Sequence, residues 1–178
     1  MTRAVSARPG SLSVERTFRN MQKNTTEPAI GREKMVQLLN EVLAREYQAI
    51  IAYTVYSQTI KGAAYNTIAK ELETHATEEL GHALKIACQI DYLGGRPGVA
   101  PRPVEFDPDA KKLLRFDLHY ERETIANYRE RIRQADAMRE FAFSEVLRTI
   151  IAEEQEHEVD LCNALGIEVP SLPAPAAQ

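Results

Sequence analysis

The chain has 178 residues, of which 44% are apolar and 27% charged, and its formal net charge is −4. This length suits one ordinary domain with a sizeable core, and this charged fraction excludes both a membrane-embedded and a wholly disordered chain. No apolar run approaches the roughly 18 residues of a membrane span, and the first residues lack the apolar core of a secretory signal. The acidic balance argues against nucleic acid as the main partner. We therefore expect a soluble cytoplasmic protein.

Both ends of the sequence are predicted to be tails. Residues 1–30 hold five basic and two acidic side chains and show no persistent helical period, which indicates a flexible basic arm. Residues 169–178 include Pro170, Pro173 and Pro175, which prevents a helix there. The folded domain is accordingly predicted to span residues 31–168.

Between the tails, apolar residues recur at spacings of three and four, the period of a helix with one buried stripe. Gly62, Gly94 and Gly166 are expected to end three of the helices. Asp107-Pro108-Asp109 is expected to start another, with an N-cap and a proline at the first helical position. In chain order, the four predicted helices are about 32–61, 65–93, 107–135 and 139–165.

Connection lengths predict the topology. The first and last connections are only a few residues long, so each should join an antiparallel helical hairpin. The middle connection, GGRPGVAPRPVEF, reaches about 40 Å at roughly 3.3 Å per residue, which is close to the length of a ~28-residue helix. The expected fold is an all-α four-helix bundle with one long crossover between helices 2 and 3.

Each predicted stripe is mostly apolar but carries a glutamate near its middle. In chain order these glutamates are Glu46, Glu79, Glu121 and Glu154. Unpaired buried carboxylates cost several kcal/mol each, so a core that contains four of them needs a group that neutralises them.

The spacing of the histidines identifies that group as a pair of metal ions. Glu79 and His82 form a Glu-x-x-His pair, and so do Glu154 and His157. Residues i and i+3 share a helix face, so each pair presents a carboxylate and an imidazole to one point. The glutamates of the first two helices are 33 residues apart, as are those of the last two. The predicted metal ligands are Glu46, Glu79, His82, Glu121, Glu154 and His157.

This donor set, one Glu from each of two helices and Glu-x-x-His from each of the others, is that of di-iron carboxylate bundles. Four carboxylates balance two divalent cations, and oxygen and imidazole donors suit Fe, with Mn or Zn as substitutes. The chain resembles the ferritin-like superfamily, and most closely its bacterioferritin branch, over residues 32–166. The resemblance is carried by the ligand set and by the stretches LLNEVLAREYQAI, EELGHA, LRFDLHYERE and EVLRTIIAEEQEHEVDL.

The resemblance implies a role for each ligand. Glu46 and Glu121 would be terminal ligands, Glu79 and Glu154 would bridge both metals, and the two histidines would each cap one metal. Tyr53 matches the tyrosine that hydrogen-bonds within the site in that branch, and on this basis it is the predicted catalytic residue.

The resemblance further implies a homo-oligomeric ferroxidase that oxidises Fe(II) with O2 or H2O2 at a di-iron centre within one subunit, for iron storage or detoxification. Leu80 stands where bacterioferritins carry the methionine that binds haem, so no haem is predicted. Three alternatives remain: a manganese catalase or peroxidase-like enzyme on the same scaffold, a Dps-like DNA-protecting protein that uses the basic arm, and a structural bundle without catalysis.

The other two histidines and the two cysteines are further candidates for a functional role. His75 lies one turn before Glu79, and a hydrogen-bonded histidine of the bundle is favoured over an outer ligand on the iron path. His119 is predicted at the surface. Cys88 and Cys162 are expected to lie about 15 Å or more apart along antiparallel helices, too far for a disulfide, and are predicted to be buried or interfacial free thiols.

Overall fold

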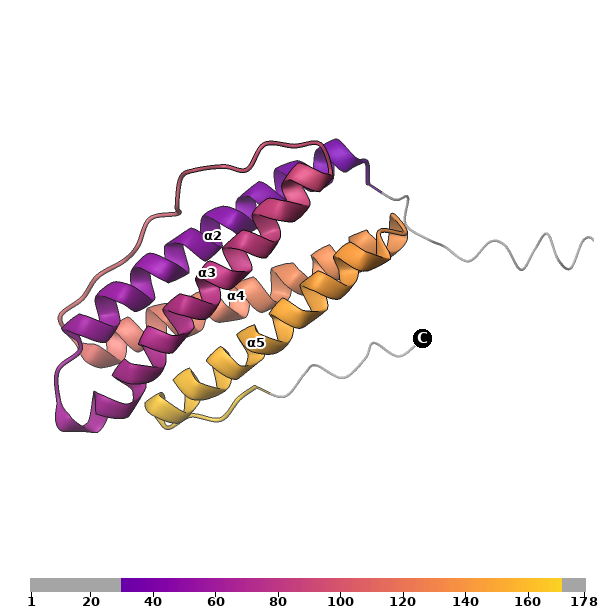
Figure 1. Ribbon diagram of the computed structural model, residues 1–178. Coiled ribbons are helices and arrows are strands. Elements are labelled where there is room, and N and C mark those ends of the chain that lie inside the picture. Colours follow the sequence, from indigo (N-terminus) through magenta and orange to yellow (C-terminus); the bar gives the residue numbers. More distant parts are fainter. Residues whose placement is uncertain (1–29, 171–178) are drawn as a thin grey trace, which may run out of the picture.

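The computed structural model describes residues 30–170, which form four long helices and one short 3₁₀ turn (Figure 1). The long helices are α2 (Arg32–Thr59), α3 (Asn66–Tyr92), α4 (Ala110–Ala137) and α5 (Phe141–Leu165). The turn η1 (Ala63–Tyr65) joins the first two. The described residues contain no strand, and the predicted all-α four-helix bundle is confirmed. The predicted arm and tail lie almost wholly outside this range.

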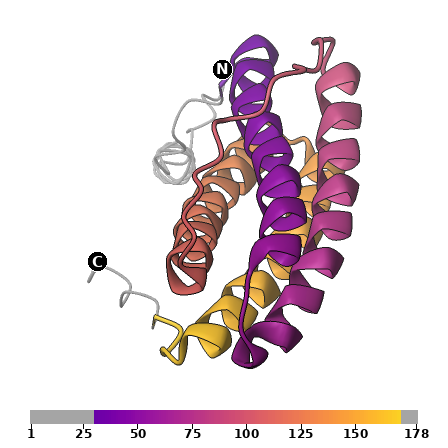
Figure 2. The same cartoon turned by 90° about the vertical axis from the view of Figure 1, so that its left-hand side faces the viewer.

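The helices form two antiparallel hairpins, α2 with α3 and α4 with α5, as the short connections predicted (Figure 1). The long crossover runs along the outside of α2 and returns the chain to the end of the bundle where α3 began (Figures 1 and 2). Asn40 holds this segment by accepting from Gly98 N at 2.6 Å and donating to Arg96 O at 3.2 Å. Arg102 N donates to Ala44 O at 2.9 Å. No helix among the described residues is long and apolar enough to cross a membrane.

The core consists of two apolar clusters, one toward each end of the bundle. The first includes Leu39, Ile86 and Leu147, and the second includes Tyr56, Leu72 and Leu118. Burial of these side chains is the main force that holds the two hairpins together, at about 1.5–3 kcal/mol for each large apolar side chain. The middle of the bundle, between the clusters, contains the predicted metal ligands.

The helix ends differ in detail from the predicted ones. α4 begins after Asp109, whose side chain accepts from Lys112 N at 3.0 Å, so Asp109 and not Asp107 is the N-cap. Asp107 instead accepts from Asp109 N at 2.8 Å, which forms a turn ahead of the helix. α2 ends at Thr59, before Gly62, whose φ of 121° serves the start of η1. Gly166, with φ 67°, caps the end of α5 as predicted.

Candidate metal centre

The six predicted ligands come from all four helices and meet at mid-height in the bundle. Each exposes 3% or less of its surface. Their positions follow from local sequence, because a single glutamate on α2 or α4 and a Glu-x-x-His pair on α3 or α5 each fall on the inward stripe. The bundle brings all six together in two overlapping groups.

The first group surrounds His82. Its Nδ1 atom lies 3.2 Å from Glu79 Oε2, 3.2 Å from Glu154 Oε1 and 3.6 Å from Glu46 Oε2. The ligand atoms of these four residues all lie within 4.8 Å of one another. A carboxylate-rich pocket with one imidazole is a donor set that suits a divalent transition metal.

The second group surrounds His157. Its Nδ1 atom lies 3.2 Å from Glu79 Oε1, 3.5 Å from Glu154 Oε2 and 4.0 Å from Glu121 Oε2. Glu79 and Glu154 therefore belong to both groups, and each directs one oxygen toward His82 and the other toward His157. This is the geometry that a bridging carboxylate requires.

Many of the donor atoms lack a hydrogen bond, although they are buried. These atoms are Glu46 Oε2, Glu79 Oε1, Glu121 Oε2, both carboxylate oxygens of Glu154, and His157 Nδ1. A buried polar atom without a partner costs about 1–3 kcal/mol, and more if it is charged. Their orientation toward a common point leaves them free to bind cations.

Crowding of the carboxylates also changes their protonation when no cation is present. Burial, reinforced by the charge of Glu79, raises the pKa of Glu46 well above its usual range. Burial and the charge of Glu154 do the same to the pKa of Glu121. Burial lowers the pKa of His157, but the carboxylates of Glu154 and Glu79 outweigh it and raise this pKa to about 12. The metal-free centre thus holds protons that divalent cations would replace.

Two glutamates outside the predicted set orient the histidines. His82 Nε2 lies 2.6 Å from Glu153 Oε2, and His157 Nε2 lies 2.9 Å from Glu78 Oε2. With a carboxylate accepting at Nε2, each ring keeps its Nδ1 atom turned toward the centre. Sequence reasoning missed both residues, although the doublets Glu78-Glu79 and Glu153-Glu154 repeat in the two Glu-x-x-His motifs.

Two tyrosines hold the carboxylates of Glu46 and Glu121 across the hairpins, as the two glutamates hold the histidines. Tyr128 Oη donates to Glu46 Oε1 at 2.7 Å, and Tyr53 Oη donates to Glu121 Oε1. Burial, together with the charge of Glu121, raises the pKa of Tyr53 well above its usual range, so its hydroxyl stays a donor. Each tyrosine therefore fixes a glutamate that belongs to the opposite hairpin.

The other two histidines of the bundle and both cysteines lie outside the six predicted ligands. The side chain of His119 is 66% exposed, as predicted for a surface residue. Both cysteines are free thiols; Cys162 is buried as predicted, whereas Cys88 is exposed in the single chain, and its prediction as an interfacial thiol stays a prediction. His75 is buried against the centre, with Nε2 3.3 Å from Asp160 Oδ2. Burial first, and then the nearby His157, lower the pKa of His75 to about 4, which keeps it neutral.

A four-helix bundle with two Glu-x-x-His motifs around shared carboxylates defines the ferritin-like di-metal class. The ferritin-like domain model matches residues 36–167, and the chain belongs to this family. A ferritin-like, diiron-carboxylate protein from Bacillus anthracis is 33% identical, with a TM-score of 0.73, over 75% of this chain and 96% of that one.

Two further relatives are similar over most of their length. The bacterioferritin of Brucella melitensis is 25% identical over 145 residues, which cover 78% of this chain and 90% of that protein. A dodecameric thioferritin from Bacteroides fragilis, described as bacterioferritin-related, is 26% identical, with a TM-score of 0.72, over 85% of this chain and 93% of that one.

Proposed function

We propose that this chain binds two Fe(II) ions per subunit and oxidises them with O2 or H2O2, as a ferritin-type ferroxidase. The observation that supports this most is the orientation of Glu79 and Glu154, which direct one oxygen each to either histidine. Two ions bridged in this way lie close enough to deliver two electrons to one oxidant molecule. The kinship with bacterioferritins favours the same chemistry.

The residues present fit two divalent ions. Four ionised carboxylates carry four negative charges, which two divalent cations neutralise. The unpaired oxygens of the glutamates and the Nδ1 atoms of the histidines provide the oxygen and nitrogen donors that Fe(II), Mn(II) and Zn(II) accept. We expect Fe to be the native metal.

Two Fe(II) ions supply one electron each. With these two electrons and two protons, O2 becomes H2O2. With the same two electrons and two protons, H2O2 becomes two molecules of water. Glu79 and Glu154 would each reach both ions, and Glu46 and Glu121 would bind one ion each. Glu78 and Glu153 keep the histidines in the metal-binding tautomer. The two apolar clusters above and below keep bulk water away from the centre.

Aerobic oxidation of Fe(II) tests the proposal. The wild-type protein should oxidise two Fe(II) per subunit in a fast phase. Absorbance in the near ultraviolet measures this phase. In Glu154→Gln the rate of this phase should fall more than the roughly 10- to 100-fold by which loss of a ligand's hydrogen-bonding partner lowers metal affinity or activity. Glu145→Gln, which changes an exposed carboxylate on the same helix, is the matched control. A wild-type rate equal to that of Glu154→Gln would refute the proposal.

The same measurements separate the alternatives. O2 evolution from H2O2 by the Mn(II)-loaded protein, without Fe(II) oxidation, would identify a manganese catalase. A gel shift of DNA that disappears on deletion of residues 1–30 would favour a Dps-like role. Storage requires a closed assembly, and the relative from Bacteroides fragilis is a dodecamer. We therefore propose a homo-oligomer, and expect gel filtration after aerobic Fe(II) addition to show one large, iron-containing species.

A further inference from the structure

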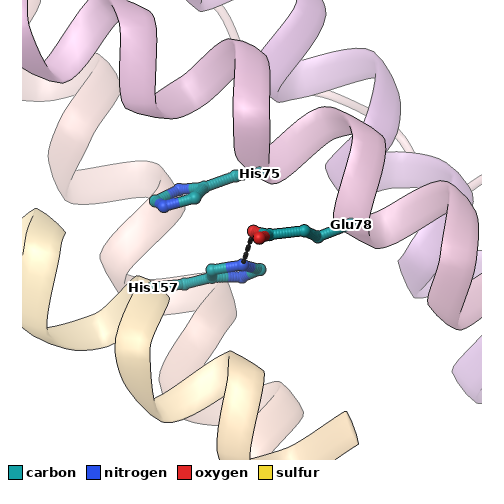
Figure 3. A group of neighbouring side chains, drawn as sticks. All are labelled: His75, Glu78 and His157. Carbon is teal, nitrogen blue, oxygen red and sulfur yellow. Dashed lines mark hydrogen bonds and ion pairs between the residues drawn. The ribbon is translucent and has the colours of Figure 1, made fainter.

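Potential ligands continue beyond the candidate metal centre, between α3 and α5, and Figure 3 draws the group next to it, His75, Glu78 and His157. His75 is only 3% exposed, and its Nδ1 atom has no hydrogen-bond partner. Figure 3 shows the His75 ring over that of His157, with Glu78 beside them; the ring centroids are 4.1 Å apart. A buried imidazole in contact with a metal-ligand histidine is unlike the rest of the bundle stripe, since the mirror position on α5 is Ile150.

Two carboxylates connect His75 to the surface. Glu71 lies one turn before it on α3, and Asp160 faces it from α5 with Oδ2 3.3 Å from Nε2. Ligand atoms of these three residues lie within 4.8 Å of one another. Glu71 and Asp160 are both half-buried, and both line a pocket of about 470 Å³ between α3 and α5. A cation that enters this pocket from solvent would meet the two carboxylates, and His75 lies next to Asp160.

From this pocket to the centre, potential ligands follow one another without a break. The outer group consists of Glu71, His75 and Asp160, and it shares His75 with the group drawn in Figure 3. The group in Figure 3 in turn shares His157 with the candidate metal centre, where His157 lies beside Glu79 and Glu154. These shared residues define a line of potential ligands along which an ion would move inward by ligand exchange. The opposite face offers no equivalent, because Ile150 replaces the histidine there.

We propose that Glu71, His75 and Asp160 form an accessory binding site for one divalent transition-metal ion, at the outer end of a route to the di-metal centre. The two carboxylates match the charge of one divalent cation, and a mixed oxygen and imidazole set suits Fe(II), Mn(II), Co(II) or Zn(II). The open pocket leaves room for water at the remaining coordination positions. Delivery of the ion to the di-metal centre rests on the proposed function. The accessory site itself is tested separately, by the number of ions that each chain binds.

Anaerobic titration with Co(II), followed by calorimetry and visible absorbance, tests the site. The wild-type chain should bind three Co(II), and the double variant Glu71→Gln/Asp160→Asn should bind two. Both substitutions are at positions open to solvent and keep side-chain size, so the fold is retained, which circular dichroism checks. The matched control Asp91→Asn/Glu145→Gln changes exposed carboxylates on the same two helices, far along each from the pocket, and should bind three.

The route has its own readout. At low Fe(II), the double variant should show a fall of at least about tenfold in kcat/KM for Fe(II) oxidation, with a smaller change at saturating Fe(II). Two Co(II) in both the wild type and the double variant would overturn the accessory site and leave the di-metal centre standing. Fewer than two in the wild type would refute the proposed function itself. Three in the double variant would assign the third ion elsewhere and overturn this inference.

Discussion

His82 is held by Glu153, which belongs to the other hairpin: the His82 Nε2 atom lies 2.6 Å from the Glu153 Oε2 atom across the α3–α5 contact. The reciprocal pair joins His157 of α5 to Glu78 of α3 at 2.9 Å. Each of these two helices therefore supplies both a predicted metal-binding histidine and the carboxylate that orients the histidine of the other. The metal centre and the packing of the two hairpins depend on the same contacts.

Removal of Glu153 should weaken metal binding without loss of the fold. In Glu153→Ala, His82 loses the acceptor that fixes its tautomer and ring orientation, which should cost about 10- to 100-fold in metal affinity. Glu153 is 36% exposed, so its loss leaves little buried surface unfilled. Calorimetric titration with Co(II) measures the effect, with Glu156→Ala, an exposed glutamate of the same helix, as the control. Equal affinities in the two variants would show that the pair is not functional.

The two tyrosines should behave alike if they position carboxylates. Tyr53→Phe and Tyr128→Phe each remove a donor to a buried glutamate, at about 1–3 kcal/mol. We expect similar losses of metal affinity in both, together with a drop of several degrees in the melting temperature of the metal-loaded protein. A loss of Fe(II) oxidation confined to Tyr53→Phe, with metal affinity unchanged, would instead give Tyr53 a direct role in the chemistry.

Glu154→Gln should separate stability from function. It is fully buried, and neither of its carboxylate oxygens has a hydrogen bond. In the metal-free protein, loss of this charge removes repulsion from Glu79 but also the attraction to protonated His157, so the melting temperature should change little. In the presence of Co(II) or Zn(II) the wild type should gain stability and the variant should gain far less. A variant that gains as much stability from these ions as the wild type would show that Glu154 is not a ligand.

The pH dependence of the metal-free protein follows from the raised pKa values. Glu46 and Glu121 have folded-state pKa values above the ordinary 4.5, and that of His157 rises from 6.5 to about 12. Because the folded state binds more protons, this stabilisation is complete below the unfolded pKa values and is lost as pH rises. The melting temperature of the metal-free protein should therefore fall between about pH 5 and pH 8.

Bound metal should reverse this trend. Divalent ions take the place of the protons, so the rise in melting temperature that they cause should grow with pH over the same interval. Thermal denaturation with and without Zn(II) at several pH values measures both trends. A metal-free melting temperature that climbs steadily from pH 5 to pH 8 would contradict the protonated centre.

The sequence by itself determined the helices, the topology and the six inward donors. Helical period and the i to i+3 relation are local, so Glu79 and His82 had to share a face wherever α3 was placed. The equal spacing of the two halves fixed the heights at which the donors would meet. Helix ends were less certain, since Asp107 and Asp109 both suit an N-cap and only the path of the crossover selects between them.

The tertiary structure alone decided which side chains support those donors. Glu78, Glu153 and Asp160 are ordinary helix-surface residues in the sequence, and their partners lie 79, 71 and 85 residues away. His75 is an example: its local pattern favoured a hydrogen-bonded bundle histidine, and only the α3–α5 crossing placed it against His157, between the pocket and the centre. Contacts between helices depend on rotation and separation of whole elements, which the period of a single helix does not encode.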